Sequence, residues 1–224
     1  MAGTATLASP RSEATRAALV RAALDLFGMK GFEATSTREI AAAAGANVAS
    51  IAYHFGGKEG LRIACADHVV AALGGVFARA GADPPEIERL SALAARNRLA
   101  QIAEAMVDAI VARDAARPLA RFVLREMFEP SAAFERVYAG AFATMHARAC
   151  AIWARATGVG PESEATRLAV FAMIAQIVYF RLARPAVLRR LGWRDIGAAE
   201  SAAIKRLVVG NLGAALQHAR KTKR

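Results

Sequence analysis

The sequence predicts an all-α protein of about nine helices. Hydrophobic residues make up 55% of its 224 residues, with alanine supplying the excess, and alanine has the highest helix propensity. Runs of β-branched residues and Asn-Gly hairpin signals are nearly absent, so strands are not expected. Apolar residues instead recur at three- and four-residue spacing between Gly and Pro breaks, which is typical of successive amphipathic helices.

The first predicted helix follows a leader of small residues, 1–10, that we expect to be flexible. Ser12 can cap this helix, and Leu19 and Phe27 recur on its apolar face. Gly31 can end it, because glycine tolerates the left-handed backbone found at helix C-termini.

Residues 35–61 predict two short helices joined by a tight turn and read TSTREIAAAAGANVASIAYHFGGKEGL. Ser36 and Glu39 have capping-box spacing at the start of a helix over 37–44. Gly45 can end that helix, and Asn47 is placed to cap the next one, over 48–54. Such spacing is that of a helix-turn-helix, whose second helix enters the DNA major groove.

More helices are expected after Gly56 and Gly57, with breaks at Gly and Pro residues and with Pro118 at the favoured early position of one of them. They span residues 58–80, 86–113, 118–130, 131–157, 162–183 and 198–218.

From about Arg16 to Leu61 the chain resembles the TetR-type bacterial repressors. The resemblance rests on an ordered set of motifs: a Leu-Phe pair before Lys-Gly-Phe, the Thr that follows, the Ala-Ala-Gly turn and the ending Tyr-His-Phe…Lys-Glu-Gly-Leu. It implies four parts, which are a flexible arm (1–11), a helix-turn-helix domain (12–57), a ligand-binding and dimerisation domain (58–219) and a basic tail (220–224).

The resemblance also implies which residues meet DNA. Arg38 is the candidate for a bidentate guanine contact, beside Thr37 at the groove edge. Asn47, Ala49 and Ser50 occupy the first turn of the recognition helix, where bases are read. Tyr53, His54 and Lys58 are expected to hold phosphates. For Tyr53 and His54, packing on the small core stays open as the alternative.

Two positions depart from the family pattern. Val48 and Ala52 stand where many relatives carry longer polar or aromatic residues. Direct base readout is therefore expected to be sparse, with DNA shape contributing. Arg11 and Arg16 could reach along the DNA backbone from the arm.

The C-terminal part resembles the CerR-like ligand-binding domain of some TetR-type regulators, over roughly residues 85–215. RFVLREMFEPSAAFE and AQIVYFRLARPAVLRRLGW carry this likeness. It implies a ligand-responsive homodimer, with the helices 162–183 and 198–218 of each subunit forming a four-helix interface. A dimer predicts a palindromic operator in double-stranded DNA.

A pocket for a small, largely apolar effector is expected among the middle helices. Core packing is the alternative role for each candidate. Gln176 is the best of them, because an amide in an apolar helix needs a partner, either ligand or another helix. The candidate lining is Met106, Ile110, Phe122, Met145, His146, Met173, Gln176 and Tyr179. Nearby, Arg125 and Glu126 are expected to brace the helix 118–130 as an ion pair, with anion binding as the alternative.

Charge and hydropathy limit the partners. Thirty basic and 19 acidic residues give a net charge of +11, which favours a polyanionic partner. Residues 131–224 carry 15 basic and five acidic residues, and residues 1–60 only six and five, so net charge does not locate a DNA surface. The apolar run 168–180 is shorter than the ~20 residues needed to span a membrane and is expected to be a buried helix. Two distant cysteines and no secretory segment predict a cytoplasmic protein.

These features together predict a sequence-specific repressor that a ligand releases from DNA. No catalytic motif is present, so we expect neither an enzyme nor a cofactor or metal. An activator is the first alternative. A metal- or thiol-responsive regulator is the second, through Cys65, His68, His146 and Cys150, whose spacing puts each Cys/His pair on one helix face. A helical small-molecule-binding protein without a regulatory role is the third.

Overall fold

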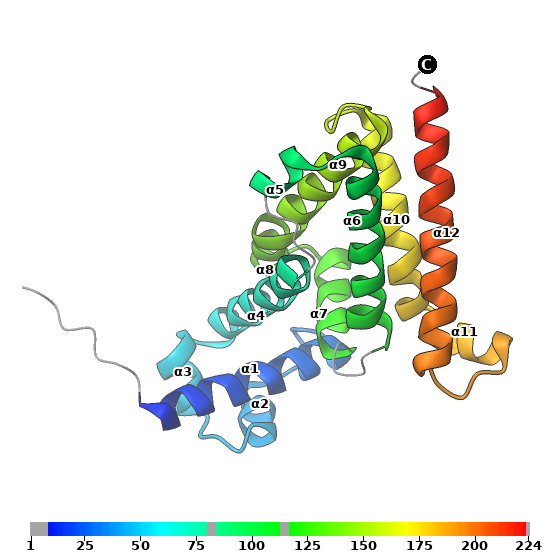
Figure 1. The fold of residues 1–224 in the computed structure, drawn as a ribbon. Coiled ribbons are helices and arrows are strands. Elements are labelled where there is room, and N and C mark those ends of the chain that lie inside the picture. The colour runs from blue at the N-terminus through cyan, green and yellow to red at the C-terminus, as the bar shows by residue number, and fades with distance from the viewer. Residues whose placement is uncertain (1–8, 80–83, 113–116, 223–224) are drawn as a thin grey trace, which may run out of the picture. The chain divides into compact units, whose positions relative to one another are not determined.

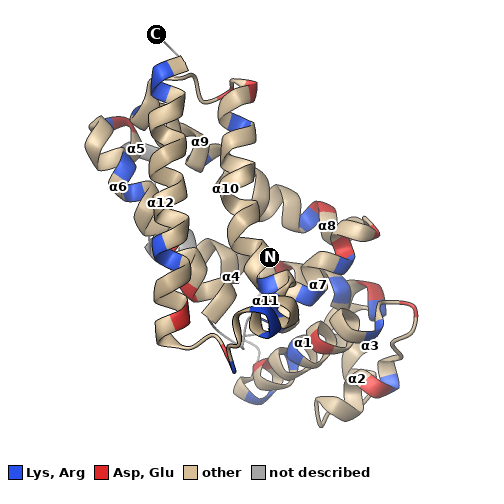
Figure 2. Cartoon of the chain, turned by 90° about the vertical axis from the view of Figure 1, so that its right-hand side faces the viewer, with Lys and Arg blue, Asp and Glu red and all other residues tan. Residues whose placement is uncertain are grey.

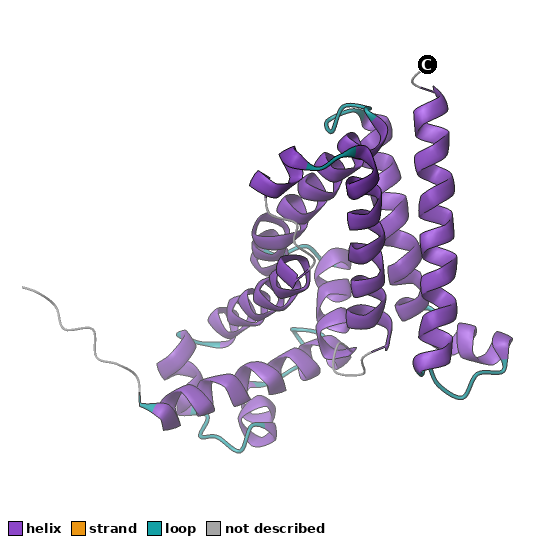
Figure 3. Ribbon diagram, viewed as in Figure 1, coloured by secondary structure: helices purple, strands orange, loops and turns teal. Residues whose placement is uncertain are grey.

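The structure is a computed structural model that describes residues 9–79, 84–112 and 117–222. Every regular element within these ranges is helical, as the sequence predicts (Figure 3). The helices pack into two compact units. The first unit contains residues 9–71 and 117–138, and the second contains residues 72–79, 84–112 and 139–222.

Helix α1 (Pro10–Lys30) begins earlier than the sequence predicts (Figure 1). Its N-cap is Ser9, whose hydroxyl accepts a hydrogen bond from the backbone N–H of Ser12. The prediction of Ser12 as the cap is therefore wrong, because Pro10 is already helical and suits the first turn, where its missing N–H costs nothing. Pro10 and Arg11, predicted to lie in the arm, are therefore helical, and residues 1–8 of that arm lie outside the described residues.

Helices α2 (Thr37–Ala43) and α3 (Ala49–Phe55) form the predicted helix-turn-helix. Ser36 and Glu39 form the capping box, and Gly45 adopts a φ of +62° at the turn. The N-cap of α3 is Val48 and not Asn47 as predicted, because the helix begins one residue later than expected. The Asn47 side chain accepts from the backbone N–H of Ala49, the first residue of α3, at 2.9 Å. A hydrogen bond from Lys30 lowers the pKa of Glu39 to about 2, so the capping carboxylate stays ionised at neutral pH.

Helix α4 (Lys58–Arg79) starts in the first unit and continues into the second. Gly60 allows its first turn to approach α3, because a Cβ there would lie only 1.8 Å from the carbonyl oxygen of Phe55. Cys65 is buried in the first unit, with its thiol 3.7 Å from the Val20 carbonyl oxygen.

Helices α7 (Arg117–Phe128) and α8 (Ala132–Val137) also belong to the first unit. Helix α7 packs closely on α1, since a Cβ at Gly28 would stand 2.9 Å from the Cβ of Arg121. Phe122 is buried in this unit, whereas the other seven residues of the predicted pocket lie in the second.

The second unit contains a larger apolar core, which Ile152, Trp153, Ile177 and Leu216 help to form. Its further elements are α5 (Pro84–Arg89), α6 (Ala92–Met106), the π-helix η1 (Val107–Ala112), most of the π-helix η3 (Tyr138–Phe142), α9 (Ala143–Thr157), α10 (Glu164–Leu182), α11 (Arg184–Leu191) and α12 (Ala198–Thr222).

Two segments of the second unit differ from prediction. The sequence predicts one helix over 86–113, but the structure divides it at Leu90, and the Ser91 hydroxyl caps α6 by accepting from Ala94 N–H. Arg155 donates to the Leu90 carbonyl that this break exposes. No helix is predicted between 183 and 198, but α11 occupies Arg184–Leu191, with Pro185 in its first turn, a position that proline tolerates.

Helix α10 is less buried than its apolar sequence predicts. Val170 and Ile177 face the core, whereas Leu168, Phe171 and Tyr179 are largely exposed. Of the helices in the described residues, α10 alone is long and apolar enough to cross a membrane by length and composition. The prediction of a buried helix is wrong for the single chain, because no helix among the described residues of the second unit covers the face that carries these three side chains.

We predict that two of three serines near helix starts contribute to stability. Ser9→Ala and Ser36→Ala should each lower the free energy of unfolding by about 1 kcal/mol, because each removes an N-cap acceptor. Ser12→Ala is the matched control and should not destabilise, because alanine favours the helix interior. Urea denaturation followed by circular dichroism measures all three, and a destabilising Ser12→Ala would contradict the cap assignment.

Candidate nucleic-acid interface

Helix α3 packs through one side and presents the other to solvent. Ile51 is its buried residue, and Ala49, Ala52 and Tyr53 are exposed. A helix that is anchored by one apolar residue and is otherwise open can enter a DNA groove without unfolding.

The residues predicted to contact DNA lie at accessible positions of the first unit. Arg38, in the first turn of α2, is exposed, and Thr37 beside it is half-buried. Asn47 and Ala49 are exposed, and Ser50 is half-buried. The Asn47 oxygen accepts from Ala49 N–H, which leaves its amide N–H groups as the donors available to a base.

Tyr53 projects into solvent with 83% of its surface exposed. Its ring meets the edge of His54 at a centroid distance of 5.0 Å, and His54 is half-buried beside Phe55. The alternative of core packing is therefore wrong for Tyr53, and the phenol is accessible to a phosphate.

Lys58 is the first residue of α4, and its ammonium lies 4.2 Å from the centroid of Phe32. The guanidinium of Arg62, one turn on, lies 4.4 Å from the same centroid. Arg16 lies over Phe55 at 5.4 Å. Backbone N–H groups at a helix start and a nearby ammonium are a combination that binds anions.

Charge elsewhere does not single out one face. Figure 2 shows basic positions on both units with acidic positions among them. The excess of basic residues after residue 131 includes Arg189, Arg190 and Arg194, which are exposed in and just after α11.

Contacts that the sequence did not predict join α7 to α1 and α4, the helices that precede and follow the helix-turn-helix. Arg125 and Glu126 do not brace α7 as an ion pair. Arg125 donates to the carbonyls of Gly28 and Met29, and Glu126 pairs with Arg62. Consecutive helical residues point in different directions, and this geometry is the only sequence signal that argues against the predicted pair.

Seven of the eight predicted effector-binding residues lie in the second unit, and Phe122 lies in the first. Met106 is buried in the core, and Ile110, Met145 and Met173 pack against it. Gln176 donates to the Met173 sulfur and accepts from the Asn211 amide of α12 at 3.0 Å, so another helix already supplies a partner. Tyr179 is 61% exposed.

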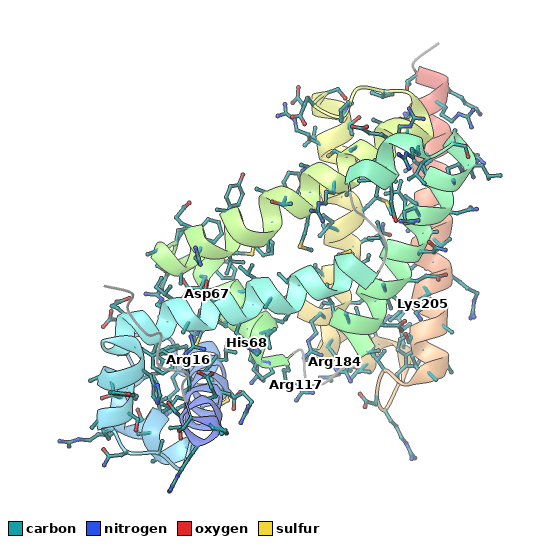
Figure 4. The ribbon with its side chains drawn as sticks, turned by 60° about the vertical axis from the view of Figure 1, so that its left-hand side comes forward. Arg16, Asp67, His68, Arg117, Arg184 and Lys205 are labelled. Carbon is teal, nitrogen blue, oxygen red and sulfur yellow. The ribbon has the colours of Figure 1, made fainter. Side chains whose placement is uncertain are left out.

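A hollow of about 360 Å³ lies elsewhere in the second unit, between η1 and the start of α12. The ion pair of Asp108 with Lys205, at 2.6 Å, lies on its wall, and Ser201 is beside it. None of the predicted lining residues borders this hollow. Figure 4 labels Lys205 on α12.

The two Cys/His pairs lie in different units. Cys65 and His68 are on α4 in the first unit, whereas His146 and Cys150 are on α9 in the second. Cys150 is 3.6 Å from His146 Nδ1, and burial raises the pKa of both thiols. Within the described ranges, no three His, Cys, Asp or Glu side chains are grouped to hold a metal ion.

Two family sequence models match the chain. The model described as "Bacterial regulatory proteins, tetR family" matches residues 19–65, which contain α2 and α3. The model of the C-terminal domain of the HTH-type transcriptional dual regulator CecR matches residues 95–217. The subgroup expected from the sequence is thereby identified as the CecR type.

Individual proteins show the same likeness. The chain is 34% identical over 213 residues to the HTH-type transcriptional dual regulator CecR of Shigella flexneri. This alignment covers 92% of this chain and 93% of that protein. It is 51% identical over 47 residues to the probable HTH-type transcriptional regulator YttP of Bacillus subtilis, covering 21% and 23% of the two chains.

Solved structures share the fold. A TetR-like transcriptional regulator from Rhodococcus sp. RHA1 superposes with a TM-score of 0.66 at 18% identity, covering 95% of this chain and 99% of that one. A TetR-family regulator from Streptomyces coelicolor gives 0.65 at 17% identity, covering 96% and 98%.

Proposed function

The chain belongs to the TetR family of bacterial transcriptional regulators, with a C-terminal domain of the CecR type, and we propose that it is a cytoplasmic repressor released from its operator by a small ligand. It is a DNA-binding regulator and not an enzyme. The observation that carries the proposal is the open face of α3, which ends beside Lys58 at the start of α4.

In the proposed complex, base reading and phosphate binding fall to different residues. Arg38 carries a planar fork suited to guanine in the major groove. Asn47, Ala49 and Ser50 approach bases from the first turn of α3, with Thr37 at the groove edge. Tyr53, His54 and Lys58 bind phosphates, which set the register of the helix without reading sequence.

We propose a homodimer formed through α10 and α12. The support is a set of large apolar side chains that are 45–61% exposed on these two helices: Leu168, Phe171, Tyr179, Leu182 and Leu207. Those on α10 recur at intervals of three to eight residues that place them on one face. A second copy presenting the same face would cover them, and its twofold symmetry would match a palindrome with half-sites about 34–36 Å apart.

We propose that the effector enters among the middle helices of the second unit, where its site is lined by Met106, Ile110, Met145, His146, Met173 and Gln176. Of the other two predicted residues, Tyr179 lies on the exposed face proposed for the dimer, and buried Phe122 lies in the first unit. Met145 and Met173 are only partly buried and flexible enough to move aside. The ligand must bind the DNA-incompetent state more tightly, and a coupling of about 1–3 kcal/mol is typical of such switches.

Regulation in both directions is a second candidate. The relative that is 34% identical over nearly the whole chain carries the name dual regulator. Transcription in vitro from two or more bound promoters would separate the candidates, because a pure repressor lowers the output of each.

The first experiment is fluorescence anisotropy with ~30-bp duplexes tiled across the DNA upstream of the protein's own gene, at physiological salt. We expect one palindromic tile to bind about a thousandfold more tightly than scrambled duplex. Equal, weak and steeply salt-dependent binding to every tile would argue against a specific operator there.

Two substitutions separate the predicted roles in DNA binding. Arg38→Ala should weaken operator binding by about 1–3 kcal/mol and relax the preference for one base pair. Lys58→Ala should weaken all sequences alike and reduce the slope of log affinity against log salt by about 1. If both variants bind like the wild type, the assignment of these residues is wrong.

The dimer is tested by charging its proposed face. Leu168→Glu on α10, or Leu207→Glu on α12, should convert the dimer into monomers, because a carboxylate would be buried without a partner. Leu93→Glu on α6 is the matched control, since Leu93 is 67% exposed outside the proposed interface. Sedimentation equilibrium gives the masses, and a dimer that survives both substitutions would refute this interface.

A further inference from the structure

Glu126 of α7 is a carboxylate with only 4% of its surface exposed. It binds Arg62 of α4 through two hydrogen bonds, from Nε to Oε1 at 2.8 Å and from Nη2 to Oε2 at 3.1 Å. The Ser131 hydroxyl donates to Oε2 at 2.5 Å. A buried carboxylate that is paired and hydrogen-bonded in this way fixes the position of its partner, because breaking the pair would leave a buried charge with little water to solvate it.

Arg62 in turn contacts the turn that precedes the helix-turn-helix. Its guanidinium lies 4.4 Å from the centroid of Phe32, in the turn before α2, and Lys58 lies 4.2 Å from the same centroid. Arg62 and Lys58 are four residues apart on α4, so two cations share one ring and one helix face. Like charges at this spacing repel, and Glu126 is the carboxylate that compensates Arg62.

The same stretch of α7 also holds the end of α1. Arg125 donates to the carbonyls of Gly28 at 3.1 Å and Met29 at 2.9 Å. Its guanidinium lies so close to Gly31 that a Cβ there would be 3.1 Å from Nη1. Arg125 therefore fixes the end of α1, and Glu126, through Arg62, fixes Phe32 in the turn that leads into α2.

We infer that Glu126 is a positioning residue for DNA binding: through Arg62 and Phe32 it holds Lys58 where a phosphate can be bound. This inference rests on the proposed phosphate contact of Lys58. Without the carboxylate, Arg62 keeps its charge but loses its counter-ion, and its repulsion of Lys58 over the shared Phe32 ring is no longer compensated. The proposal extends the DNA-binding machinery to a residue 64 positions beyond Arg62.

The test is a double-mutant cycle between Glu126→Gln and Lys58→Ala, measured as operator affinity across a salt series. Glu126→Gln should weaken binding about tenfold, within the range of couplings through packed networks. It should also lower the salt slope by about 0.9, the share of one phosphate. Lys58→Ala should then have little further effect, so the two losses are not additive. Additive losses, or an unchanged salt slope in a variant with wild-type circular dichroism, would overturn the inference.

Two further variants complete the design. Asp67→Asn is the matched control, because Asp67 of α4 pairs with Arg136 of α8 at 2.6 Å but both side chains are exposed (Figure 4 labels Asp67). The same acid-to-amide change there should leave affinity and slope unchanged. If Glu126→Gln fails to fold, Ser131→Ala replaces it, with an expected loss of about twofold and the same lack of additivity. A wild-type protein that binds no duplex of any sequence, even at low salt, refutes the proposed function itself, which is a different outcome.

Discussion

The first unit, called the DNA-binding unit below because it contains α2 and α3, depends on the close packing of α7 on α1. It is possible because Gly28 has no side chain where the Cβ of Arg121 approaches. Once α7 lies there, Arg125 reaches the last carbonyls of α1, which no helical N–H can satisfy. Glu126 meanwhile reaches Arg62 on α4. One close approach between backbones thus orders three helices around the turn that precedes α2.

Local signals were sufficient to predict the helix-turn-helix. The capping box of Ser36 and Glu39, and glycines in the left-handed region at Gly31 and Gly56, act within a few residues of themselves. The start of α1 was predicted wrongly because Ser9 and Ser12 carry the same side chain, and only the backbone conformation shows which of them is the N-cap. The Arg62–Glu126 pair was not predictable, because the partners are 64 residues apart and nothing in their neighbourhoods identifies the match.

The C-terminal part was predictable as helices but less so as a site. Helical spacing predicted α9, α10 and α12. The apolar composition of α10 did not reveal that Leu168, Phe171 and Tyr179 would be exposed in the part of the chain that the structure describes. Periodicity reports how apolar a face is and not which molecule covers it. For Gln176 the sequence left open whether its partner is a ligand or another helix, and Asn211 of α12 is the partner in the structure. The DNA and effector contacts stay predictions, because a single chain contains neither partner.

The DNA-binding unit is not a contiguous segment of the chain. It is assembled from residues 9–71 and from residues 117–138, with α5, α6 and η1 between them in sequence. If two relatives exchanged their chains from the end of α3 onward, the recognition helix would stay, but α7 and α8, which complete its unit, would be replaced. A regulator of this design can therefore acquire a new effector domain by recombination only together with a compatible α7 and α8, or with α1 and α4 adapted to the incoming ones.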